Sequence, residues 1–266
     1  MSDNPSGRGS DETVVFFHAH PDDESIFTGG TISLLVAQGV RTVVVVATGG
    51  ERGDGSLATS LSEVRAAEAE AACRILGVDA LHFLGYTDSS TEEGGRSGFD
   101  VFHTAPVGEA ALRLARLLRD ERATALVTYD DGGIYAHPDH LAVHRVGAMA
   151  AELADVGSVY EATVDREYLH FVETHLVGHA IEWLLGEDAV PATNRAPLGV
   201  PTVMVSTTVD VRVAIARKRA AIAAHASQLP PGAAIHQMDD ETFAAVYGFE
   251  WFIRHGPAGV IEALGF

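Results

Sequence analysis

Two short segments of the chain concentrate side chains that can bind a metal ion or move a proton. Residues 18–25 (HAHPDDES) follow an apolar run at 13–17, and residues 135–140 (YAHPDH) follow another at 125–129. Both segments contain His-Pro-Asp, and imidazole and carboxylate groups are ligands that Zn²⁺ takes in proteins. Either segment alone could be a loop in which an aspartate caps the next helix. Together, each after an apolar run, they indicate a metal site.

The elements that must position these segments predict an α/β protein. Short apolar runs rich in β-branched and aromatic residues have the pattern of buried strands, and the segments between them have helical periodicity. The expected strands are 13–17, 40–48, 80–84 and 125–129, and the expected helices are 28–38, 60–76, 107–119 and 138–153. This alternation is typical of a Rossmann-like, mainly parallel sheet flanked by helices.

The ends of the expected elements indicate where a ligand would bind. Pro138 suits the first position of its helix, and Ser60 with Glu63 has the spacing of a capping box. Open α/β sheets bind ligands beyond the carboxyl ends of their strands, where the strand order reverses. We therefore expect the site at the loops 18–27, 48–57, 85–104 and 130–137.

The second half of the chain has a weaker pattern. A strand is expected at 202–210 and a helix at 211–226, whereas 160–200 is ambiguous. The apolar run at 245–253 could cover an interface between subunits or complete the core.

The chain is expected to form one domain, because no linker, low-complexity stretch or internal repeat divides it. A flexible tail at 1–12 would precede the domain at 13–266. Its core α/β half at 13–155 would be completed by the less regular residues 156–266, which would help to enclose the site.

Charge and composition exclude several classes of partner. The chain has 37 acidic and 18 basic residues, which gives a formal net charge of −19. Proteins that bind nucleic acid or anionic lipid usually present a basic surface, so we expect neither partner. Cys73 is the only cysteine, the N-terminus lacks an apolar signal core, and no apolar run is long enough for a membrane span. A cytoplasmic protein is expected, and a homo-oligomer stays open.

The two segments also carry a resemblance to a known family. HPDDE at 20–24 followed by HPDH at 137–140 resembles the LmbE/PIG-L zinc-dependent de-N-acetylases, and most of all their actinobacterial type, which includes mycothiol-pathway deacetylases and amidases. Further matches lie at 49–51, 65–68, 84–89 and 218–228. The resemblance spans about residues 13–228 and implies a Rossmann-like fold.

The resemblance implies a metal centre and a base. His20, Asp23 and His140 match the family's zinc ligands, and Fe²⁺ also binds two histidines and one carboxylate. Asp22 matches the general base. Zinc lowers the pKa of its bound water toward ~7, so a neighbouring carboxylate suffices to remove the proton as this water attacks the amide.

Three more residues are implied to assist catalysis. His137, as an imidazolium, would stabilise the oxyanion or protonate the departing amine, and Asp139 would orient it. Tyr135 could donate a hydrogen bond to the same oxyanion. No covalent intermediate is needed.

Four residues outside the two segments are expected to contact the substrate. By resemblance, Arg65 would meet a phosphate or sugar oxygen and Asp88 a sugar hydroxyl. Glu51 and His225 are further candidates. Each has a plainer alternative, because Arg65 could pair with Glu68 one helical turn on. Asp88 could be a turn residue, and His225 could be packed or capping.

The expected activity is hydrolysis of an N-acetyl group from a small molecule or conjugate that contains N-acetylglucosamine. A second hypothesis keeps the zinc but cleaves another amide, such as that of a mycothiol-type S-conjugate. A third is a non-catalytic domain that holds a metal, although the base Asp22 and the acid His137 argue against it. The stretches 89–103 and 160–200, which would select the acylated amine, match no segment of a relative, so the substrate stays open.

Overall fold

The computed structural model describes residues 11–51, 58–89, 100–176, 198–229 and 232–265. Its strands are β1 (Thr13–His18), β2 (Arg41–Thr48), β3 (Ala80–Tyr86), β4 (Ala125–Tyr129), β5 (Ser158–Thr163), β6 (Thr207–Asp210) and β7 (Phe249–His255). They form a seven-stranded sheet in the order β3-β2-β1-β4-β5-β7-β6. Strands β1 to β5 are parallel, and β7 runs antiparallel to both of its neighbours. The expected mainly parallel sheet is confirmed.

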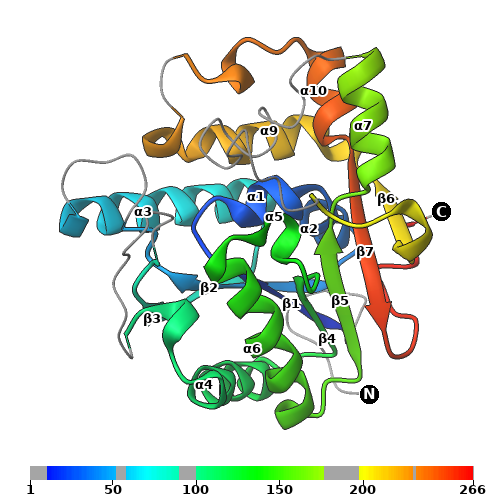
Figure 1. The fold of residues 1–266 in the computed structure, drawn as a ribbon. Helices are drawn as coiled ribbons and strands as arrows, with labels where there is room; N and C mark the ends of the chain where they lie inside the picture. Colours follow the sequence, from blue (N-terminus) through cyan, green and yellow to red (C-terminus); the bar gives the residue numbers. More distant parts are fainter. Residues whose placement is uncertain (1–10, 52–57, 90–99, 177–197, 230–231, 266) are drawn as a thin grey trace.

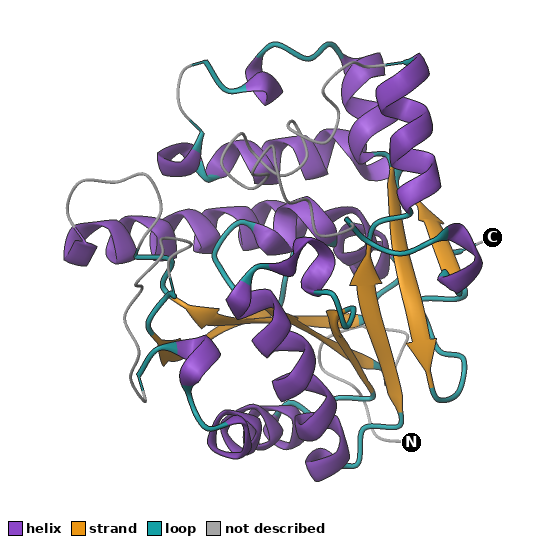
Figure 2. Ribbon diagram, viewed as in Figure 1, coloured by secondary structure: helices purple, strands orange, loops and turns teal. Residues whose placement is uncertain are grey.

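Helices cover both faces of the sheet. They are α1 (Asp23–Phe27), α2 (Gly29–Ala37), α3 (Ala58–Leu76), α4 (Val107–Asp120), α5 (Gly133–Ala136), α6 (Pro138–Ala154), α7 (Arg166–His175), α9 (Ile215–Ala224) and α10 (Asp240–Tyr247). Helices α2, α3 and α9 pack together on one face, and α4 packs against α6 on the other (Figures 1 and 2). Because both faces are covered, β1, β2 and β4 are buried along nearly their whole length, which is why their sequences are continuous apolar runs.

The reversal of strand order lies between β1 and β4. From β1 the chain continues outward to β2 and β3, and then returns through α4 to β4 on the other side of β1. At such a point the connections leave in opposite directions and open a crevice beyond the strand ends. The two segments rich in histidine and aspartate follow β1 and β4, so both lie at this crevice.

The expected element boundaries are right for most of the first half. Pro138 is the first residue of α6, as predicted. The capping box is wrong, because α3 begins at Ala58 and Ser60 lies inside the helix. The loop expected at 18–27 is also shorter than predicted, because α1 already begins at Asp23.

The second half departs further from expectation. The strand predicted at 202–210 is wrong in its first part, where Thr202–Met204 forms a 3-10 turn, and only Thr207–Asp210 is a strand. The helix predicted at 211–226 is shorter and covers Ile215–Ala224. Part of the ambiguous stretch forms β5 and α7, and the rest lies largely outside the described residues.

The apolar run at 245–253 crosses from α10 into β7 and completes the core of this chain. Trp251 and Phe252 are buried, because β7 lies between β5 and β6. Glu250 on the same strand is buried and accepts a hydrogen bond from Lys218 Nζ at 2.7 Å. Its oxygens also accept the backbone N–H groups of Gly30 and Thr31 at the start of α2, at 2.8 Å each. Strands and ion pairs thus join the C-terminal part to the first half.

Among the described residues, no helix is both long enough and apolar enough to cross a bilayer.

Candidate active site

The turn between β1 and α1 carries the first group of candidate residues. Asp22 precedes α1 with φ of 120°, a backbone conformation that residues other than glycine rarely adopt. Arg65 of α3 holds this turn, because its guanidinium donates to the carbonyls of Pro21 at 2.6 Å and Gly50 at 2.9 Å. The same guanidinium lies 3.2 Å from Asp22 Oδ2. The turn is therefore fixed by a charged side chain from another element.

The three residues expected as metal ligands lie together. Asp23 Oδ2 is 3.4 Å from His140 Nε2 and 3.6 Å from His20 Nδ1. Asp23 Oδ2 also accepts the backbone N–H of His20 at 2.8 Å, which fixes the carboxylate in this place. All three residues are buried. Atoms at these separations can surround a single ion, since metal–ligand bonds of about 2.0–2.2 Å are normal for zinc.

The loop after β4 positions the second group. Three residues in it have left-handed backbone: Gly133, Ile134 and Ala136. A β-branched residue such as Ile134 is costly in this conformation, with a strain of about 1–3 kcal/mol. The loop is held by Asp130 Oδ1, which accepts the N–H of Ile134 at 2.9 Å, and by the N–H of Gly199, which donates to its carbonyl at 2.7 Å.

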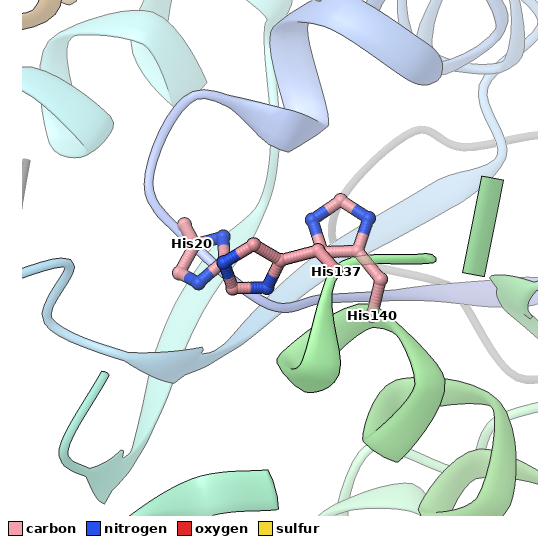
Figure 3. A group of neighbouring side chains, drawn as sticks. All are labelled: His20, His137 and His140. Carbon is pink, nitrogen blue, oxygen red and sulfur yellow. The ribbon is translucent and has the colours of Figure 1, made fainter. Parts of the chain in front are cut away.

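Three imidazoles converge from these two segments. His20 comes from the turn after β1, His137 is the residue just before α6, and His140 lies in the first turn of α6 (Figure 3). Their ring centroids are 4.7 Å apart for His20 and His137, 5.4 Å for His20 and His140, and 5.3 Å for His137 and His140. One nitrogen of each ring lies within 4.8 Å of the others, so this group could also hold a metal ion.

Asp139 differs from its expected role. Its buried carboxylate lies 3.2 Å from His20 Nε2 and accepts the N–H groups of Ser89 at 2.9 Å and His103 at 3.1 Å. The described hydrogen bond to His137 comes instead from the backbone N–H of Asp139, which donates to Nδ1 at 3.2 Å. The Asp139 side chain therefore orients His20 rather than His137.

Asp88 and Glu51 lie at the same end of the sheet. Asp88 is buried, and its Oδ1 lies 3.5 Å from His20 Nε2. The backbone N–H of Asp88 donates to Glu51 Oε2 at 3.0 Å. His20, Asp88, His137 and Asp139 form a second group of atoms close enough to hold an ion. Asp88 is thus next to the side chains that could hold a metal ion.

Arg65 and His225 have partners inside the protein, which differs from the substrate contacts expected for them. Arg65 is 4% exposed, and its described contacts are those to the turn and to Gly50. His225 is 1% exposed, and its Nε2 lies 2.7 Å from Glu24 Oε1. The alternative pairing of Arg65 with Glu68 is not among the described contacts, in which Glu68 accepts the N–H and the hydroxyl of Ser227.

The pKa values of two candidate residues are strongly perturbed. Burial raises the pKa of the Asp22 carboxyl to about 6, against the opposing charge of Arg65. Burial, together with the charges of His20 and His140, lowers the pKa of His137 to about 3. His137 is therefore neutral in this arrangement, which agrees with its Nδ1 accepting a hydrogen bond, whereas the resemblance implied an imidazolium.

The charges of the site fit a divalent cation. Burial opposes ionisation of Asp23, yet the neighbouring His140 and His20 hold the pKa of its carboxyl well below its usual range. Asp139 is ionised for a similar reason, because hydrogen bonding and charge from His20 outweigh burial and lower its pKa. Buried carboxylates are stable only when paired with positive charge. Imidazole nitrogens beside such carboxylates are the donor types that zinc takes, so the residues present could hold that metal.

Sequence reasoning missed the residues behind His140. The Tyr129 ring lies 4.6 Å from the His140 ring at 30°, and its hydroxyl is 2.8 Å from His18 Nδ1. Thr28 Oγ1 lies 3.1 Å from the other nitrogen of His18. Burial lowers the pKa of His18 to about 4, so its ring is neutral. Both His18 and Tyr129 end strands, but their contact becomes evident only once β1 and β4 are known to be neighbours.

Comparisons with known proteins identify the family of the chain. Residues 15–151 match the model of the PIG-L family, described as GlcNAc-PI de-N-acetylase. A relative from Thermobispora bispora, a 1D-myo-inositol 2-acetamido-2-deoxy-alpha-D-glucopyranoside deacetylase, is 33% identical over 94% of this chain and 90% of its own length. A deacetylase of the same name from Salinispora arenicola is 34% identical, over 91% of this chain and 84% of its own length.

A solved structure supports the fold. The N,N'-diacetylchitobiose deacetylase of Pyrococcus horikoshii superimposes with a TM-score of 0.59 at 21% identity and covers 92% of this chain and 84% of its own. The matched family segment runs from within β1 to within α6 and so includes both groups of candidate residues. On this match and on the identity to its curated relatives, the chain belongs to the PIG-L family.

Proposed function

We propose that this chain is a hydrolase that removes the acetyl group from an N-acetylglucosamine unit of a small molecule. The observation that carries the proposal is the meeting of His20, Asp23 and His140 beside the carboxylate of Asp22, at the strand ends that the family match covers. The curated relatives are named for an inositol conjugate of N-acetylglucosamine, which makes that conjugate the first candidate substrate.

The metal in this proposal is Zn²⁺, which His20 Nδ1, Asp23 Oδ2 and His140 Nε2 would hold. The choice of Nδ1 rests on the contact of His20 Nε2 with Asp139 at 3.2 Å, since a carboxylate that accepts one ring N–H leaves the other nitrogen free to bind. When bound, zinc would polarise the acyl oxygen and lower the pKa of a water molecule. His137 is close enough to replace one of these three ligands, and metal analysis of variants distinguishes the two possible ligand sets.

Asp22 would accept the proton of the attacking water. Its side chain is 23% exposed, in contrast to the almost completely covered Asp23. Its pKa of about 6 lies near physiological pH, where a carboxylate is ionised but more basic than usual. The left-handed backbone at Asp22 and the grip of Arg65 turn two successive carboxylates in different directions, which permits one to bind metal and the other to move a proton.

Tyr135 and His137 would serve the acyl oxygen and the leaving nitrogen. The Tyr135 hydroxyl lies 3.3 Å from His140 Nε2, beside the proposed metal ligands. Burial and the surrounding aspartates, first of all Asp23, raise its pKa well above the usual value, so the hydroxyl stays protonated and can donate to an oxyanion. His137 accepts at Nδ1 and therefore has its proton on Nε2, from which it could donate a hydrogen bond to the reacting amide. The proton that Asp22 accepts from the water would pass to the leaving amine.

The Asp88 carboxylate would accept a hydrogen bond from a sugar hydroxyl. Glu51 Oε2 accepts the backbone N–H of Asp88 and so holds the residue in place. Of the loop at 89–103, Ser89 and 100–103 are described, and the N–H groups of Ser89 and His103 bind Asp139. Both ends of the loop are thus tied to the site.

The single cysteine, Cys73, is unpaired and buried in α3, which supports the proposal of a reducing, cytoplasmic location.

An acetate- and amine-release assay with metal analysis on the same purified sample tests this function. The substrates are the inositol conjugate of N-acetylglucosamine, free N-acetylglucosamine, diacetylchitobiose and a cysteinyl amide conjugate. We expect turnover of an acetylated sugar that is lost on chelation and restored by Zn²⁺. Release from the cysteinyl amide alone would favour the amidase hypothesis, and absence of both bound metal and turnover would refute the proposal.

His140→Ala tests the ligand set. We expect its zinc content to fall well below that of wild type, because a buried ligand is lost. His144→Ala is the matched control, since His144 lies one turn further along α6 and pairs with Glu161 at 3.2 Å. A His140→Ala chain with unchanged zinc content would show that other residues hold the metal.

A further inference from the structure

A buried pair of charged side chains joins the C-terminal part of the chain to the turn that carries Asp22. His225, which follows α9, places its Nε2 2.7 Å from Glu24 Oε1. Both side chains are at most 1% exposed, and they are 201 positions apart in the sequence. The proposed reaction uses neither of them, so the pair requires another explanation.

Glu24 connects this pair to the candidate base. Its second oxygen, Oε2, accepts the backbone N–H of Asp22 at 3.0 Å. The donor of that bond, Asp22, is the residue with φ of 120°, a conformation that persists only when surrounding contacts hold it. Arg65 grips the other side of the turn through the carbonyl of Pro21 and Asp22 Oδ2. The Asp22 carbonyl also accepts the N–H groups of Ser25 and Ile26 in the first turn of α1. Glu24 and Arg65 are therefore the two side chains that hold Asp22, one at its backbone N–H and one at its carboxylate.

A neighbouring link offers an internal comparison. Two residues after His225, Ser227 donates its N–H and its hydroxyl to the two oxygens of Glu68 on α3, at 2.7 Å each. This link joins the same C-terminal segment to the helix of Arg65. Its described bonds do not include Asp22 or Pro21. The segment 225–227 thus has one contact that reaches the turn directly and one that anchors it to α3.

We propose that Glu24 and His225 are positioning residues for the catalytic carboxylate of Asp22. His225 holds the Glu24 carboxylate in place, and Glu24 holds the strained backbone of Asp22, from which the catalytic carboxylate projects. The inference rests on the proposed role of Asp22 as the base. Displacing a reacting group by 1 Å can reduce turnover about 10²-fold. Neither residue would contribute to substrate affinity, because both side chains are almost completely buried and paired with each other.

Kinetics of four variants of the full, zinc-loaded chain test this inference. We expect Glu24→Ala to lose about 10²-fold in kcat with little change in KM, because the backbone of Asp22 loses its acceptor. Glu24→Gln keeps an oxygen for the Asp22 N–H and should recover most of that loss. His225→Ala should fall between them. Ser227→Ala, the matched control, should keep wild-type kcat even where its thermal midpoint falls.

Zinc content and thermal unfolding are measured on each sample, so that kcat is expressed per folded, metal-loaded chain. If Glu24→Ala does not fold, Glu24→Gln and His225→Ala are compared instead, and His225→Ala should have the lower kcat at equal zinc content. Wild-type kcat in the Ala variants, or losses equal to that of Ser227→Ala, would overturn the inference. An inactive wild-type chain would instead refute the proposed function, which separates the two failures.

Discussion

The turn 21–24 and the loop 132–137 lie at the ends of adjacent parallel strands, and both force residues other than glycine into left-handed backbone. In the turn this residue is Asp22, and in the loop they are Ile134 and Ala136. The two segments are held in different ways. Two charged side chains hold the turn, Arg65 from the distant α3 and Glu24 from within the turn, whereas the loop is held by Asp130 and by the backbone of Gly199.

The partners of each segment explain this difference. Arg65 and Glu24 bind the turn through a guanidinium and a carboxylate. In the loop, Asp130 of the preceding strand end binds the N–H of Ile134, and the backbone of Gly199 binds its carbonyl. The Asp22 side chain is 23% exposed and can be changed without disturbing the packing around it, but the backbone contact between the loop and Gly199 depends on close approach. A change at Asp22 should therefore affect chemistry alone, and changes in the loop should affect chemistry and folding together.

The largest expected effect is that of Asp22→Asn. The amide keeps the size of the side chain but cannot accept a proton, and loss of a general base typically costs about 10²–10⁴-fold in rate. We expect kcat to fall in this range while zinc content and thermal midpoint stay near wild type. Asp131→Asn, an exposed aspartate in the other segment, is the control. A near-normal rate for Asp22→Asn would remove Asp22 as the base.

In the loop, Tyr135→Phe removes the hydroxyl that lies beside His140. Loss of one oxyanion donor costs about 10²–10³-fold in kcat in other hydrolases. We expect a loss at the lower end of this range, since the metal would also bind the acyl oxygen. Steady-state kinetics with the best substrate measure it. Tyr168→Phe, which removes a hydroxyl bonded to the carbonyl of Ala245, should keep its activity, and an equal loss in both would contradict the role.

Gly199→Ala tests whether the loop couples activity to folding. Gly199 has φ of 56°, and a Cβ there would lie 2.0 Å from the carbonyl oxygen of Val164. We expect a loss of about 1–3 kcal/mol in unfolding free energy, as for other strained backbones, and a fall in kcat because Ile134 loses its partner. Chemical denaturation and kinetics measure both. Gly157→Ala, where a Cβ would meet nothing within 4 Å, is the control. Reduced stability with unchanged kcat would contradict the coupling.

The smallest effect is expected at the other end of the sheet, where Glu121 pairs with Arg41 and His82. Burial raises the pKa of Glu121, but its hydrogen bonds to these two residues outweigh that and lower it. A depressed pKa in the folded state stabilises above the unfolded value of about 4.3, and the contribution is lost as pH falls below it.

Glu121→Gln should therefore cost up to about 1 kcal/mol at pH 7 and nothing below the folded pKa. Denaturant unfolding as a function of pH measures this, with kcat at pH 7 unchanged. A difference in stability that persists at low pH would show that packing, and not charge, is responsible.

The sequence predicted the parts of the site that depend on local pattern. Apolar runs located β1 and β4, and the parallel sheet that they imply puts their carboxyl ends side by side. For this reason the two segments rich in histidine and aspartate were expected at one edge of the sheet, and the resemblance implied His20, Asp23 and His140 as the metal ligands within them. The roles of Arg65 and His225 could not be predicted this way. Their types suit substrate contact equally well, and only the packing of α3 and α9 turns them toward the turn.

By itself, therefore, the sequence determined the fold class, the strand ends at which the candidate residues lie and the family to which the chain belongs. The tertiary structure alone decided which polar side chains face each other once buried. A buried charge must find a partner, and that partner can lie anywhere in the chain. Glu24 finds His225, and Asp139 orients His20 rather than its near neighbour His137, because hydrogen bonds depend on direction and distance in space, not on position in the sequence.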